Sequence, residues 1–99
     1  MPNKEGLVLL TSLKDAVLKA IIEYNKYRSP EAIAKLIKIS KNELILEFKG
    51  SFCRTCGVYD YFEDFIYELK RLTNVDIEIL SFEEYETETI RVKYALNKV

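Results

Sequence analysis

The chain has 99 residues, with 15 lysine or arginine side chains against 16 aspartate or glutamate side chains and no histidine. This length predicts one domain, because a single hydrophobic core typically organises about 100–150 residues. The net charge of −1 lacks the basic excess expected of a strong duplex-DNA binder. The absence of histidine excludes Ser-His and Cys-His catalytic pairs and also histidine metal ligands.

The sequence also predicts the setting of the protein. No apolar run approaches the roughly 18 residues that a membrane span needs, and no basic segment followed by a long apolar stretch begins the chain. We therefore expect a cytoplasmic protein without a signal peptide, an anchor or a membrane partner. Glutamine is absent and methionine occurs only at position 1, a bias typical of thermophilic proteins that suggests an archaeal source.

The N-terminal part of the chain combines a short apolar run with a helical pattern. Residues 6–10, Gly-Leu-Val-Leu-Leu, predict a buried strand. Thr11 and Ser12 then offer an N-cap, and Asp15 follows Ser12 at the spacing of a capping box. Apolar residues recur from there at three- and four-residue intervals, which predicts a helix that ends near Tyr27. Its buried face comprises Leu13, Val17, Ala20, Ile21 and Tyr24.

Residues 29–40 are compatible with two structures. Ser29 followed by Pro30 is typical of a helix start, and that helix would run to about Lys38. The alternative is a hairpin of residues 34–40 and 43–49, joined by a turn at Lys41-Asn42. Alternation of isoleucine with polar residues over 37–40 favours the hairpin, which is the structure we expect.

The second half of the chain predicts strands on either side of another helix. Residues 43–48 are rich in branched apolar side chains and form the most secure strand. Asp60 is expected to cap a second helix. Its core stripe comprises Phe62, Phe65, Ile66, Leu69 and Leu72. A strand over 75–81, an acidic loop over 83–88 and a last strand over 89–96 complete the pattern.

Together these elements predict an α+β protein. Two amphipathic helices would cover one face of an antiparallel sheet in a two-layer sandwich. The expected order is ferredoxin-like, strand-helix-strand-strand-helix-strand, with one more strand at the C-terminus. Fold-level analogy of this kind does not carry function.

Both cysteines lie in one loop, over residues 50–57, as Cys53-Arg54-Thr55-Cys56. A thiolate near a helix N-terminus and beside Arg54 would be stabilised, as in a thiol–disulfide redox protein. However, the chain has no proline after Pro30 to supply the cis-proline loop of a thioredoxin fold, and the acids near residues 60–64 oppose thiolate formation.

The same two cysteines resemble half of a zinc knuckle. A structural zinc site needs four ligands, so zinc would have to be shared across a dimer or completed by Asp60 and Glu63. We interpret Cys53 and Cys56 as structural, either a disulfide or two packed thiols that stiffen the loop. Such a short bridge contributes at the low end of the usual range of about 0–5 kcal/mol.

These observations lead to one functional expectation and two alternatives. We expect a homodimeric module that works by binding an unknown ligand or a protein partner, with no catalytic residues. The expected loop surface comprises Phe52, Arg54, Gly57, Tyr59 and Asp60 around the two cysteines. The alternatives are redox chemistry at Cys53 and Cys56, or single-stranded nucleic-acid binding. No RNP-type motif or Gly-rich phosphate loop occurs, so a nucleic-acid partner is not expected.

Overall fold

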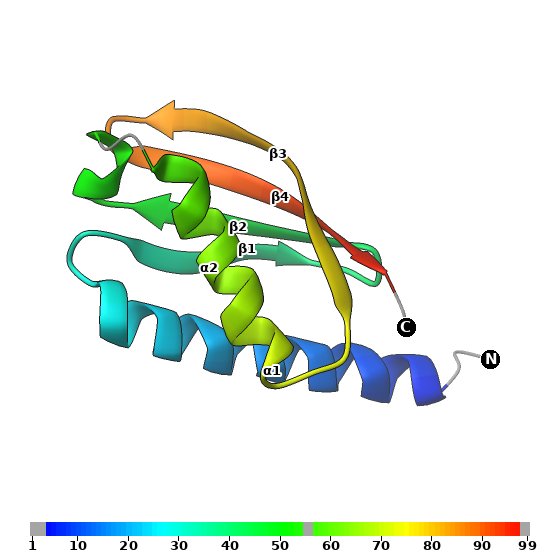
Figure 1. Ribbon diagram of the computed structural model, residues 1–99. Coiled ribbons are helices and arrows are strands. Elements are labelled where there is room, and N and C mark those ends of the chain that lie inside the picture. Colours follow the sequence, from blue (N-terminus) through cyan, green and yellow to red (C-terminus); the bar gives the residue numbers. More distant parts are fainter. Residues whose placement is uncertain (1–3, 55–56, 98–99) are drawn as a thin grey trace.

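Two helices pack against a four-stranded antiparallel sheet (Figure 1). The computed structural model describes residues 4–54 and 57–97, with side chains from residue 12 onward. The elements are α1 (Lys4–Arg28), β1 (Ile33–Ile39), β2 (Glu43–Lys49), a short 3-10 helix η1 (Ser51–Arg54), α2 (Val58–Lys70), β3 (Asp76–Glu86) and β4 (Thr89–Asn97). The strand order is β1-β2-β4-β3, with every neighbouring pair antiparallel. The expected α+β architecture and the hairpin of β1 and β2 are therefore confirmed.

The predicted N-terminal strand is wrong, and with it the ferredoxin-like order. Residues 6–10 belong to α1, which runs without interruption from Lys4 and contains Thr11 and Ser12 in its interior. A short apolar run does not by itself distinguish a strand from a helix, and here the helical pattern that follows extends backward through it. The order in the described chain is helix-strand-strand-helix-strand-strand.

The core lies between the helices and the inward face of the two central strands. Leu44, Leu46 and Phe48 of β2 are buried, and the register sets Leu46 opposite Val92 and Phe48 opposite Ile90 of β4. The predicted helical stripes are confirmed in both helices, because Val17, Ala20, Ile21, Tyr24, Phe62, Phe65 and Leu69 are all buried. Leu13 and Ile66 are only partly buried against this core. Leu72 is outside it, because α2 ends at Lys70 and the Leu72 side chain is exposed.

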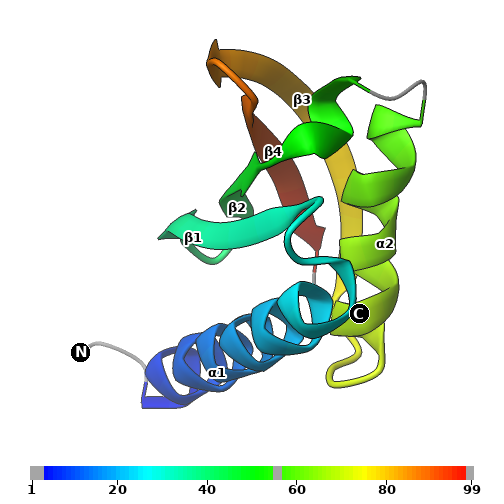
Figure 2. The same cartoon turned by 90° about the vertical axis from the view of Figure 1, so that its left-hand side faces the viewer.

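The edge of the sheet formed by β1 is covered by α1, which lies beside it in both views (Figures 1 and 2). The Asn25 side chain of α1 forms two hydrogen bonds with the backbone of Ala34. Its Nδ2 donates to the Ala34 carbonyl (3.0 Å), and its Oδ1 accepts from the Ala34 N–H (2.7 Å). A neighbouring strand would form the same pair of bonds, so Asn25 takes the place of a strand at this edge.

Replacing Asn25 with alanine is expected to lower the free energy of unfolding by about 1–3 kcal/mol. The reason is that the backbone N–H and the carbonyl of the buried Ala34 both lose their hydrogen-bond partners. Glu23→Ala is the matched control, because Glu23 is exposed on α1 and this substitution leaves both bonds to Ala34 in place, so a change below about 1 kcal/mol is expected. Urea denaturation of the three proteins measures the difference. Equal stability of Asn25→Ala and the parent protein would contradict this role.

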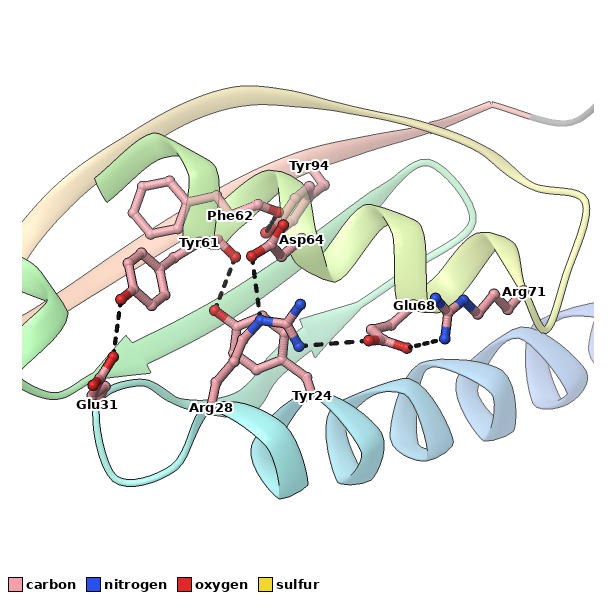
Figure 3. A network of polar contacts seen from close by, with 9 residues as sticks. All are labelled: Tyr24, Arg28, Glu31, Tyr61, Phe62, Asp64, Glu68, Arg71 and Tyr94. Carbon is pink, nitrogen blue, oxygen red and sulfur yellow. Dashed lines mark hydrogen bonds and ion pairs between the residues drawn. The ribbon is translucent and has the colours of Figure 1, made fainter. Parts of the chain in front are cut away.

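Two buried tyrosines fasten α2 to the rest of the fold (Figure 3). The Tyr24 hydroxyl of α1 donates to the Tyr61 carbonyl (2.9 Å), and the Tyr94 hydroxyl of β4 donates to the Phe62 carbonyl (3.0 Å). Burial raises the pKa of both phenols, so both hydroxyls remain protonated donors at neutral pH. The first turns of α2 are thereby fixed against both α1 and the sheet. Within the described residues, neither helix is long and apolar enough to cross a membrane.

Candidate functional site

The segment after β2 is anchored to the fold by buried and backbone contacts. Phe52 is fully buried, with its ring centroid 5.0 Å from that of Tyr61 and 6.1 Å from that of Phe62. The expectation that Phe52 belongs to a loop surface is therefore wrong. Phe52 is the buried residue of η1, and its backbone N–H donates to the Glu31 carbonyl (3.0 Å).

The other predicted loop residues are distributed around the start of α2. Arg54 is exposed and its Nη2 forms an ion pair with Glu88 Oε1 (2.6 Å) in the turn between β3 and β4. Gly57 is the N-cap residue of α2, without a side-chain cap, and its carbonyl accepts from the Asp60 N–H (3.1 Å). Asp60 therefore lies in the first helical turn and is not the cap, which corrects the predicted helix start.

The Cys53 thiol lies in an environment that opposes its ionisation. Partial burial raises the pKa of Cys53, and the negative charges of Glu84 and Glu88 raise it further. A redox nucleophile needs the opposite, a lowered pKa that supplies thiolate at neutral pH. Cys56 lies outside the described residues, so its distance from Cys53 is not defined. Within the described residues, no three acidic or cysteine side chains gather to hold a metal ion.

Thiol alkylation measures this electrostatic effect directly. In a Cys56→Ser background, Cys53 is expected to react with iodoacetamide with an apparent pKa above that of an ordinary cysteine. Glu84→Gln should lower that pKa, because the substitution removes a negative charge that disfavours the thiolate. Glu23→Gln on the exposed side of α1 is the control and should leave it unchanged. A Cys53 pKa at or below the ordinary value would support the redox alternative.

An aromatic pair beside this segment was not predicted from the sequence. Phe82 of β3 packs against Tyr59 of α2, with ring centroids 6.2 Å apart, and against the buried Phe62 at 5.1 Å. Phe82 and Tyr59 are nevertheless 47% and 48% exposed. The rings of Phe62, Phe82 and Tyr59 are therefore in contact in series from the core to the surface. The Phe82 and Tyr59 rings are partly exposed to solvent.

The reason Phe82 was missed is that β3 is longer than expected. Residues 83–88 were predicted as an acidic loop, but β3 continues to Glu86 and only Thr87 and Glu88 form the turn to β4. The cross-strand partners Glu83↔Arg91 and Glu84↔Ile90 extend the pairing with β4. The density of charge concealed the strand, and the two adjacent glutamates between Phe82 and Tyr85 break the alternation. The remaining signal was the presence of these two aromatic residues, a type enriched in strands.

The second half of β3 is exposed on both faces. All seven residues from Leu80 to Glu86 are exposed, including the large side chains of Leu80, Phe82 and Tyr85. Phe82 lies opposite the buried Val92 and therefore faces α2, whereas Tyr85 stacks on Arg91 on the other face of the sheet. We call the exposed ring pair of Phe82 and Tyr59, on the side of α2, the β3 surface. Tyr85 lies under the Arg91 guanidinium, whose central carbon is 3.7 Å from the ring centroid. The β3 surface therefore combines apolar area with a strongly acidic strand.

A cluster of charged side chains between the two helices has a structural role (Figure 3). Arg28 at the end of α1 forms ion pairs with Asp64 (3.3 Å) and Glu68 (3.5 Å) of α2, and its guanidinium lies over the Tyr24 ring. Arg71 pairs with the other oxygen of Glu68 (3.5 Å). Each charge in this cluster has a partner of opposite sign, so the cluster joins α1 to α2.

Comparison with known proteins adds little. No protein-family model matches the sequence, and no curated protein sequence matches it. A solved structure from work on "Probing the function of heme distortion in the H-NOX family" resembles the chain with a TM-score of 0.46 and 15% sequence identity. The likeness covers 89% of the present chain and 49% of that chain, so the present chain spans about half its length. A likeness this remote bears on neither ligand nor chemistry.

Proposed function

We propose that the protein is a small interaction module that binds another protein through the β3 surface. The observation that carries the proposal is the exposure of the Phe82–Tyr59 ring pair, which is held in place by the buried Phe62. Tyrosine and phenylalanine are enriched at protein interfaces, because they supply large contact areas at a small cost in conformational entropy. Rings that are already fixed by the core lose little further freedom on binding.

The surroundings of the β3 surface weigh against the alternatives. The raised pKa of Cys53 disfavours a redox function. Single-stranded nucleic acid can stack on exposed rings, but such sites also need a positively charged groove for the phosphates. Here Phe82 lies on a strand that contains acidic residues and no lysine or arginine, and Tyr59 lies beside Asp60 in α2. A protein partner could cover the exposed rings with apolar side chains and pair the acidic residues with basic ones.

Site-specific photocrosslinking tests this proposal. A photoreactive phenylalanine derivative replaces Tyr59 in one protein and Tyr27 in another, because Tyr27 is exposed on α1 and does not belong to the β3 surface. In cells of the source organism, we expect discrete cross-linked proteins from position 59 and none of these species from position 27. The same species from both positions, or no cross-linked protein from position 59, would overturn the proposal.

A further inference from the structure

We infer that the β3 edge, the backbone of Asp76–Glu86 that faces away from β4, binds a basic, extended segment of a partner protein as an additional strand. This inference rests on the proposed function and names the partner class for the same surface. Addition of a strand to a sheet edge is a general mode of peptide recognition. In it, main-chain hydrogen bonds provide affinity and alternate side chains provide specificity.

The first argument is the difference between the two edges of the sheet. At the β1 edge, α1 lies alongside and Asn25 satisfies the backbone of Ala34. The β3 edge has no such cover, because β3 is the terminal strand and pairs only with β4 among the described residues (Figure 1). An edge strand presents a row of unpaired N–H and C=O groups that another chain can pair with.

The second argument is the charge of β3, which has a single sign. The strand contains five acidic residues and no basic one; the acids are Asp76, Glu78, Glu83, Glu84 and Glu86. Within the described residues none of the five forms an ion pair, since the arginine and lysine of β4 pair instead with Glu47 and Glu43 of β2. An added strand with lysine or arginine would supply the missing positive charges, and opposite charges across neighbouring strands attract.

The same charges decide against a second copy of β3 as the occupant. Two β3 edges paired in a symmetric dimer would bring ten acidic side chains to one seam, five from each copy. Like charges directly opposite one another destabilise a strand pair. The β1 edge of another copy carries Lys35 and Lys38, but α1 and Asn25 already cover it. The occupant is therefore a basic segment of a different protein.

The register of β3 limits where the added strand can pair. Its pairing with β4 is irregular between Ile79 and Ser81 and again between Glu84 and Glu86. Irregularities of this kind bend an edge and interrupt pairing. The regular stretch between them, Ser81–Glu84, contains Phe82, whose exposed ring would contact an apolar residue of the added strand. We expect the new hydrogen bonds to concentrate on this stretch.

A synthetic peptide tests the inference with a defined probe. The peptide has about seven residues, the length of an ordinary strand, and alternates lysine with valine. We expect it to bind the complete chain at low ionic strength and neutral pH. Hydrogen exchange followed by NMR should then show added protection of amides within Ser81–Glu84. A matched peptide with glutamate in place of lysine should not bind.

Two further controls separate strand pairing from charge attraction. The first is the lysine–valine peptide with every internal backbone nitrogen methylated, which keeps every charge but leaves no backbone N–H to donate to a strand. The second is the protein variant Glu78→Lys/Glu83→Lys, set against Asp15→Lys/Glu23→Lys on exposed positions of α1, which changes the net charge equally. We expect the methylated peptide and the β3 variant each to weaken binding by at least about tenfold. The α1 variant should bind like the parent protein.

Three results would overturn the inference. They are the absence of binding by the lysine–valine peptide, equal binding of its methylated form, and equal weakening by the α1 and β3 variants. None of them would affect photocrosslinking from position 59. If a protein cross-links there while the peptide fails, the β3 surface binds its partner by another geometry, and strand addition is wrong. If position 59 gives no cross-link, the proposed function itself fails.

Discussion

Replacing Phe52 with alanine is expected to lower the free energy of unfolding by about 3–5 kcal/mol, the range for removal of a buried aromatic side chain. Phe52 is fully buried, and its ring contacts those of Phe48, Tyr61 and Phe62. Its loss would leave a cavity between β2 and the start of α2. Urea denaturation monitored by circular dichroism measures the effect.

Phe82→Ala is the matched control for this substitution. Phe82 also contacts Phe62, but nearly half of its surface is exposed. Because transfer of apolar surface from water scales with the area buried, we expect Phe82→Ala to cost less than half as much as Phe52→Ala. The yield of cross-linked protein from position 59 should follow the opposite order. It should fall more in Phe82→Ala than in Phe52→Ala, because Phe82 belongs to the proposed binding surface. Equal stability losses from both variants would contradict the assignment of Phe52 to the core and Phe82 to the surface.

The two phenylalanines also show where sequence reasoning was limited. Both lie in segments with weak periodicity, and the sequence placed Phe52 on the surface and gave Phe82 no role. Phe52 lies in a single 3-10 turn, and its backbone N–H donates to the carbonyl of Glu31. That residue is distant in sequence, so no local pattern reports the contact. Phe82 was assigned no role because the glutamates that follow it were interpreted as a loop, so the predicted strand ended at residue 81.

Regular patterns, in contrast, were sufficient for most of the fold. The helical stripe of α2 and the alternation in β2 and β4 report which face is buried, because a side chain's direction follows from its secondary structure. The strand expected over residues 6–10 failed because a short run satisfies either structure. The cover over the β1 edge, provided by Asn25, depends on a tertiary contact with Ala34 and has no signature in the sequence.

Replacing Gly50 with alanine is expected to cost about 2–4 kcal/mol of unfolding free energy, because two sources of strain combine at this position. The backbone φ of Gly50 is +144°, a conformation that residues with a side chain rarely adopt. A Cβ atom would also overlap the carbonyl oxygen of Glu31 and lie 3.0 Å from the Pro30 carbonyl oxygen. Both obstacles are backbone atoms, which cannot rotate away as the end of a side chain can.

Gly57→Ala is the control, because Gly57 precedes α2 with φ at −105° and an added Cβ would lie 3.4 Å from the Asp60 carboxylate. We expect this variant to stay within about 1 kcal/mol of the parent protein. The Glu31 carbonyl that obstructs position 50 also accepts the Phe52 N–H. Displacing it in Gly50→Ala would therefore loosen Phe52, and the double variant Gly50→Ala/Phe52→Ala should lose less stability than the two single losses together. Full additivity would show that the two residues hold the segment after β2 independently.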